Sequence, residues 1–120
     1  MKVIITSYGA DCSDKVDPRF GRAAYFMVYD DQENTWESVC NQQNLEAAKG
    51  AGIQAAENVR KLEGDILITG NVGPKAFKVL NANGIKVLSA SEFAVREAYE
   101  AFKEGKLVEL TNANVEGHWF

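Results

Sequence analysis

Two arginines stand three residues apart in the segment DPRFGR, residues 17–22, directly before a run that alternates like a strand. A simple turn needs only glycine or proline beside a small polar residue, so two guanidinium groups require a further explanation. Arg19 and Arg22 could donate paired hydrogen bonds to a carboxylate, a phosphate or another anionic group. In the structural alternative, Asp17 pairs with one arginine, Pro18 and Gly21 shape the bend, and Phe20 packs in the core.

A second candidate segment is the glycine turn GNVG, residues 70–73, between the apolar run DILIT and an expected helix with Pro74 in its first turn. The first N–H groups of a helix have no partner within the helix, so a glycine turn at that place is typical of an anion site. The turn lacks the Lys-Ser/Thr of a phosphate-binding P-loop, and the alternative is that its glycines merely start the helix.

The remaining chemistry-bearing residues give little support for catalysis. Cys12 and Cys40 form no CxxC pair, and His118 is the single histidine, close to the end of the chain. A Ser-His-Asp or Cys-His device would therefore need the end of the chain to fold back, and the expected central strands lack the acids of a two-metal site. We predict that the protein is not an enzyme. The alternative is an enzyme for a small phosphorylated or carboxylated substrate, with Asp11, Asp14 or Asp17 as its base.

Composition limits the class of protein and its partners. The chain has 120 residues, 46% of them hydrophobic and 25% charged, which predicts one globular domain. Its net charge of −4, with 13 basic residues scattered among 17 acidic ones, would repel a nucleic-acid backbone. No apolar run is long enough for a signal peptide or a membrane span, so we expect a cytoplasmic protein with reduced thiols.

Periodicity predicts the elements that would position these segments. Strands are expected at 2–6, 24–30, 35–41, 65–69 and 85–88, and helices at 48–62, from Pro74 to Gly84, and after a capping box at 89–92 up to Gly105. Residues 1–105 would form the domain. Residues 106–120, which have no clear period, would form a C-terminal tail.

This order predicts an α/β fold with a mixed five-stranded sheet and helices on both faces. The βαβ units require right-handed crossovers and parallel pairing, whereas the hairpin at 24–41 is antiparallel. Ligands of such sheets bind beyond the carboxyl ends of the parallel strands. If the strand at 2–6 pairs with the strand at 65–69, residues 7–22 and 70–73 emerge together at that edge.

The segments DPRFGRAAYFMVYD, GAGIQAAENVRKLEGDILITGNVGPKAFKVL and GIKVL together resemble the dinitrogenase iron-molybdenum cofactor biosynthesis family. These are small proteins akin to NifX and to the cofactor-binding domains of NifB and NafY, and the resemblance covers Met1 to about Gly105. It implies a ribonuclease H-like three-layer fold. It also implies non-catalytic binding or carriage of an anionic iron–sulfur or iron-molybdenum cluster during cofactor assembly.

The family motif DxRFGRA and the glycine turn give the expected binding residues. The candidates are Asp17, Arg19, Phe20, Gly21, Arg22, Gly70, Asn71 and Gly73. Some members anchor the cluster through a histidine in the middle of the chain, and this chain has none there. Cys12 is therefore the first candidate metal ligand, His118 the second and Cys40 the third.

The alternative function is a protein-interaction module that docks onto a cluster-assembly partner without binding a cluster. It would use the same sheet edge or the tail ending in Trp119 and Phe120, whose aromatic side chains would be adhesive if exposed. The expected partners are thus a metallocluster or an assembly protein, with neither nucleic acid nor membrane among them.

Overall fold

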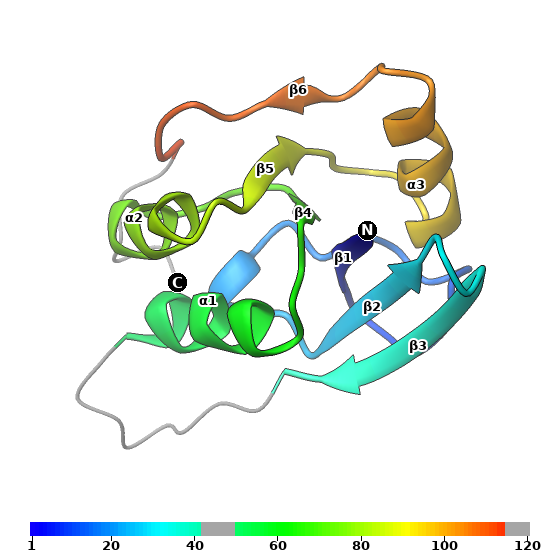
Figure 1. Ribbon diagram of the computed structural model, residues 1–120, viewed down its shortest axis with the longest axis horizontal. Coiled ribbons are helices and arrows are strands. Elements are labelled where there is room, and N and C mark those ends of the chain that lie inside the picture. Colours follow the sequence, from blue (N-terminus) through cyan, green and yellow to red (C-terminus); the bar gives the residue numbers. More distant parts are fainter. Residues whose placement is uncertain (42–49, 115–120) are drawn as a thin grey trace.

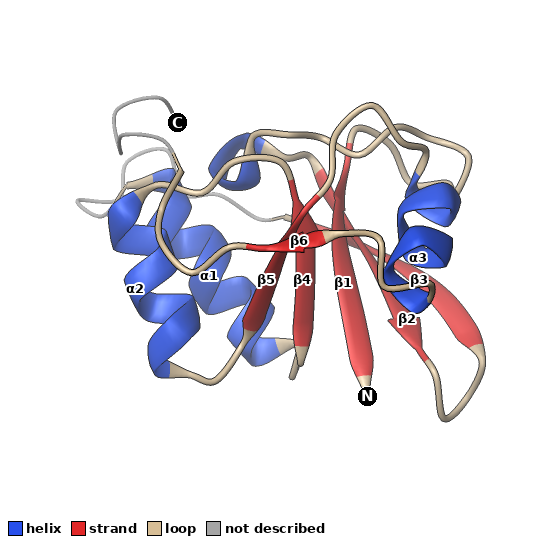
Figure 2. Ribbon diagram, turned by 90° about the horizontal axis from the view of Figure 1, so that it is seen from above, coloured by secondary structure: helices blue, strands red, loops and turns tan. Residues whose placement is uncertain are grey.

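One six-stranded sheet with helices on both faces makes up the computed structural model, which describes residues 1–41 and 50–114. The strands are β1 Lys2–Ser7, β2 Tyr25–Asp30, β3 Thr35–Cys40, β4 Ile66–Thr69, β5 Lys86–Ser89 and β6 Val108–Glu109. The helices are the 3-10 turn η1 Phe20–Arg22, α1 Ala51–Lys61, α2 Pro74–Ala82 and α3 Val95–Lys103. Helices α1 and α2 cover one face and α3 covers the other (Figures 1 and 2).

The strand order β3-β2-β1-β4-β5-β6 confirms the predicted mixed sheet. β1 pairs in parallel with β4, and β4 with β5, whereas the β2–β3 hairpin is antiparallel. The predicted number of five strands is wrong, because β6 adds a sixth beside β5. Two residues are too few to show a period, so this strand could not be found in the sequence. The ribonuclease H-like classification stays a prediction.

Alternation along the central strand β1 fills two separate cores. Ile4 packs with the side chains beneath α1 and α2, whereas Val3 and Ile5 pack with those beneath α3. All three are at most 1% exposed. A central strand covered on both faces needs apolar side chains on both, which explains the unbroken run VII.

The helix ends follow local signals, with one correction. α2 begins at Pro74, as predicted, and Gly84 beyond its end has a φ of +71°, a conformation that favours glycine. The predicted capping box at 89–92 is wrong. α3 begins at Val95, and Glu97 Oε1 accepts the Ala94 N–H at 2.8 Å. Residues 42–49, which include the first part of the predicted helix at 48–62, lie outside the described residues.

The described helices are short. The longest, α1, has 11 residues. No helix within residues 1–41 and 50–114 has the length and apolarity to cross a membrane.

Candidate functional site

The two candidate segments lie side by side where β1 and β4 end, as predicted. The Asn71 N–H donates to the Pro18 carbonyl at 2.7 Å, and the Phe20 N–H donates to the Asn71 carbonyl at 3.4 Å. Arg19 and Asn71 thereby form a parallel bridge. Parallel pairing of β1 and β4 brings the two loops to the same edge of the sheet.

Two glycines permit close backbone contacts at this place. A Cβ on Gly70 would lie 2.5 Å from Pro18 Cβ and 2.6 Å from Pro18 Cα. A Cβ on Gly21 would lie 2.8 Å from the Gly52 nitrogen at the start of α1. These two positions therefore exclude a side chain because of packing, whatever ligand the surface binds.

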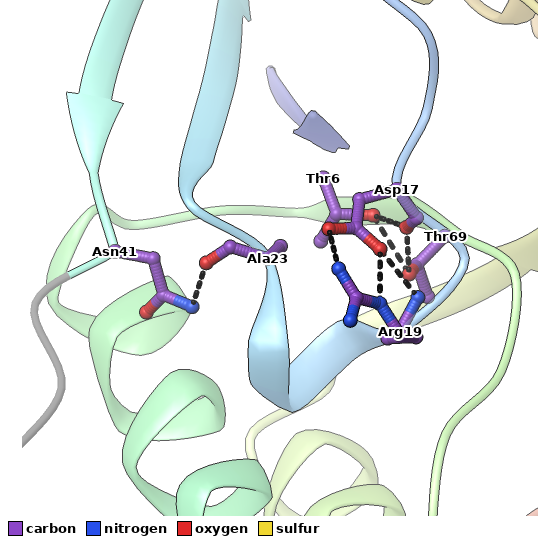
Figure 3. Close-up of polar contacts among 6 residues, drawn as sticks. All are labelled: Thr6, Asp17, Arg19, Ala23, Asn41 and Thr69. Atoms are coloured by element: carbon purple, nitrogen blue, oxygen red, sulfur yellow. Dashed lines mark hydrogen bonds and ion pairs between the residues drawn. The ribbon is translucent and has the colours of Figure 1, made fainter. Parts of the chain in front are cut away.

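Asp17 fixes the direction of Arg19 (Figure 3). Its carboxylate is 1% exposed and accepts the Arg19 backbone N–H at 2.9 Å, and Nε–H and Nη2–H at 3.2 Å each. This hydrogen bonding raises the pKa of Arg19, so the guanidinium stays charged. The Arg19 side chain is 51% exposed. The bidentate pair thus leaves a half-exposed guanidinium in a set orientation.

Two buried threonines, which the sequence did not single out, support the bend at Asp17. Thr6 Oγ1 donates to the Asp17 carbonyl and contacts Thr69 Oγ1, at 2.7 Å in each case (Figure 3). Both side chains are fully buried. The sequence signal that could have indicated these two residues is the threonine that ends each apolar run, KVIIT and ILIT.

Tyr8 is a further residue of this surface that the sequence did not indicate. Its side chain is 52% exposed, and Arg19 Cζ lies 5.7 Å from the centre of its ring. An exposed cation–π contact of this kind contributes about 0.5–1 kcal/mol. The Tyr8 ring therefore restricts where the Arg19 guanidinium can turn.

Phe20 and Arg22 divide the motif between core and surface. Phe20 is fully buried, and its ring centre lies 6.3 Å from that of Phe26. Arg22 ends η1 and is exposed, and within the described residues it makes no ion pair. Asp17 thus pairs with Arg19, and Phe20 packs in the core, as the structural alternative expects. The Arg22 side chain is exposed, and its backbone N–H donates to the Arg19 carbonyl at 3.0 Å within the bend.

The glycine turn is held by Asn114, another residue that the sequence did not indicate. Asn114 Oδ1 accepts the Val72 N–H at 2.8 Å, and the Asn114 N–H donates to the Val72 carbonyl at 3.1 Å. Gly73 is the N-cap of α2. The free N–H groups that we expected belong to the start of α2, whereas the N–H groups of Asn71 and Val72, in the turn before it, both donate within the chain.

The two candidate cysteines lie in different surroundings. Cys12 is 8% exposed, packs in the core beneath α3, and lines a groove of about 700 Å³ between residues 11–13 and α3. Cys40 is exposed and pairs with Tyr25 across the hairpin. His118 lies outside the described residues. Within residues 1–41 and 50–114, no three histidine, cysteine or acidic side chains are placed to share a metal.

The comparisons with known proteins concern the family and the fold. The family described as dinitrogenase iron-molybdenum cofactor matches residues 1–105. The apo form of the orange protein from Desulfovibrio gigas is 39% identical, with a TM-score of 0.89 over 95% of this chain and 96% of that one. A NifB-like protein from Thermotoga is also 39% identical, with a TM-score of 0.81 over 97% and 98%.

A more distant relative is an uncharacterised protein of Methanocaldococcus jannaschii. It is 28% identical over 100 residues, which cover 79% of this chain and 82% of that protein. Its description adds no activity.

Proposed function

The chain belongs to the dinitrogenase iron-molybdenum cofactor family, and from this membership we propose that it carries an anionic iron–sulfur or iron-molybdenum cluster. Carriage would be non-catalytic and would serve cofactor assembly in the cytoplasm. The family and the NifB-like neighbour fit a role in cofactor assembly. The observation that carries the proposal is the pairing of Arg19 with Asn71, which places DPRFGR and GNVG on one surface.

The charges of this surface suit an anion. Arg22 is exposed and is not committed to a carboxylate within the described residues. Arg19 is fixed by Asp17 and remains half exposed. Guanidinium groups bind the oxygen or sulfur atoms of an anion by charge-assisted hydrogen bonds, which are stronger than those between neutral groups.

The donor set indicates how a cluster would be held. The described residues offer no group of three side chains for one metal, so charge and hydrogen bonds would supply most of the affinity. Of the thiols, we propose Cys12 as the single ligand, on the loop that leads into Asp17. Its position beneath α3, on the face opposite Phe20, means that this loop would have to turn the thiol outward. His118 remains the second candidate.

Anaerobic purification and titration test the proposal. Protein isolated without oxygen should be coloured and contain iron or molybdenum. Ligand-free protein titrated with isolated iron-molybdenum cofactor should saturate at a fixed stoichiometry, followed by visible absorbance. Arg22→Ala should weaken this binding, whereas Arg60→Ala, an exposed arginine near the far end of α1, should not. Absence of uptake at micromolar protein would refute carriage.

The alternative is docking onto an assembly partner without cluster binding. It is favoured by β3, which pairs only with β2 in the described sheet and is largely exposed. An unpaired strand edge can accept a strand from another protein. Two results together would favour this function. The protein would take up no cluster, and the parent and Arg22→Ala would form an equally stable complex with a cluster-assembly protein.

A further inference from the structure

Asn114 is joined to the glycine turn by four hydrogen bonds. Its backbone N–H and its Oδ1 bind the carbonyl and the N–H of Val72, at 3.1 and 2.8 Å. Its Nδ2 donates to the Gly70 carbonyl at 3.1 Å and to Asn71 Oδ1 at 3.3 Å. One exposed side chain therefore occupies the polar groups of three successive residues of the turn.

The connection that leads to Asn114 is lightly attached. The Leu110 N–H donates to the Val87 carbonyl at 2.8 Å, and Leu110 packs against the core beneath α1 and α2. Residues 111–113 follow without a hydrogen bond to other described residues, and 111 and 112 are exposed. We call residues 111–114 the strap. Asn114 can leave the turn without disturbing β6, because the strap has no other hydrogen-bonded attachment in the described chain.

The acceptor atom of Asn114 occupies the N–H of the residue directly before the N-cap of α2. Val72 directly precedes Gly73, the N-cap of α2, and its N–H lies at the positive end of the helix dipole. Asn114 Oδ1, a neutral amide oxygen, now accepts that N–H. An oxygen or sulfur atom of an anionic cluster would make a charge-assisted bond to the same group.

We infer that the strap is an autoinhibitory latch, in which Asn114 and an anionic cluster compete for the Val72 N–H. This inference rests on the proposed function. With the strap closed, the surface offers the cluster Arg19 and Arg22. With the strap open, the surface adds the Val72 N–H. A partner that draws the strap away would therefore load the carrier, and one that lets it return would release the cargo.

The cost of the latch sets the expected effect. Hydrogen bonds of an exposed side chain are individually weak, so the open form should be a minor but accessible state. When only a fraction of molecules is competent, the apparent dissociation constant rises by the inverse of that fraction. An open fraction of about one in five to one in ten means that removing the latch tightens binding about five- to tenfold.

Asn114→Ala tests the latch, with Asn112→Ala as the matched control from the same strap. Isolated iron-molybdenum cofactor is titrated anaerobically into the full chain and its two variants. Asn114→Ala should bind about five- to tenfold more tightly than the other two. In the cofactor-free proteins, exchange of the Val72 amide proton should be faster in Asn114→Ala alone, while the amide protons of β1 and β4 exchange as slowly as in the parent. This pattern would show that the variant is folded and its strap released.

The outcomes separate the latch from carriage. If all three proteins bind with equal affinity, or Asn114→Ala binds more weakly, the latch is refuted and carriage stands. If none of them binds, carriage is refuted and the latch with it. If Asn114→Ala binds more tightly but Val72 exchange is unchanged, the gain does not come from the Val72 N–H and the latch is refuted.

Discussion

The Asp17 carboxylate accepts three hydrogen bonds from Arg19, one from its backbone and two from its guanidinium group. The acid is 1% exposed and the arginine 51%, so one partner is buried while the other faces solvent. The pair therefore has two roles. Asp17 closes the bend before η1, and the same bonds set the direction of a cation on the candidate site.

Asp17→Asn should destabilise the fold. The amide oxygen can still accept the two bonds that Asp17 Oδ1 now accepts, but the amide NH2 group cannot accept the third. The charge that strengthens all three bonds is also lost, at a cost of about 1–3 kcal/mol in the free energy of unfolding. Urea denaturation measures this difference. Glu37→Gln on the exposed strand β3 is the control and should change stability by less than about 0.5 kcal/mol. Equal stability of the Asp17 variant and the parent would contradict the structural role of the pair.

Gly70→Ala should separate the two loops of the site. The new methyl group would lie 2.5 Å from Pro18 Cβ, so the backbone must move, at a cost of about 1–3 kcal/mol. Gly50→Ala is the control, because a Cβ there meets nothing within 4 Å. Thermal unfolding should show a lower midpoint for Gly70→Ala alone. A midpoint unchanged in both variants would argue against close contact at Pro18.

The sheet and the meeting of the two loops were predictable because apolar runs and glycine signals are local. β1 and β4 read as buried strands, and their parallel pairing brings DPRFGR to GNVG. The bonds of Asn114 were not predictable, because they join residues more than 40 positions apart through a side chain with no periodic signal. Within the motif, burial of Phe20 was expected in the structural alternative, but the sequence did not tell which arginine pairs with Asp17. Phe20 lies in the core and Arg22 at the surface, although they are the first and last residues of the three-residue η1.

The two thiols should react at different rates. Cys40 is exposed at the end of β3, whereas Cys12 is 8% exposed beneath α3. A thiol-specific chromogenic reagent should modify Cys40 rapidly in the native protein, and Cys12 only as fast as its loop opens. Cys40→Ser should abolish the fast phase and Cys12→Ser the slow one. Two equally fast phases would show that Cys12 is accessible without any opening.

Tyr99 should make the fold less stable at alkaline pH. Burial beneath the aromatic rings of Tyr29 and Trp36 disfavours the phenolate and raises the pKa of Tyr99. The unfolded chain then loses this proton at a lower pH than the folded protein. Stability due to Tyr99 is therefore complete below the unfolded pKa of about 10 and falls as the pH rises through the folded pKa.

The control for Tyr99 is a tyrosine on a less enclosed part of the sheet. The urea midpoint should fall less between neutral pH and a pH above 10 in Tyr99→Phe than in the parent, because phenylalanine has no proton to lose. Tyr25→Phe, in which a half-buried ring is changed in the same way, should keep the full alkaline fall. An identical fall in all three proteins would assign the alkaline loss to other groups.

Arg22 should contribute to cluster binding by geometry as well as charge. Arg22→Ala removes an exposed guanidinium that no described carboxylate neutralises, and we expect its affinity for isolated iron-molybdenum cofactor to fall about tenfold, or about 1.4 kcal/mol. Arg22→Lys keeps the charge but not the paired donors, so its affinity should lie between those of the parent and Arg22→Ala. Titration at low and high salt separates the two contributions, because salt screens the charge shared by arginine and lysine. If Arg22→Lys binds as tightly as the parent at both salt concentrations, paired hydrogen bonding is refuted and charge alone remains.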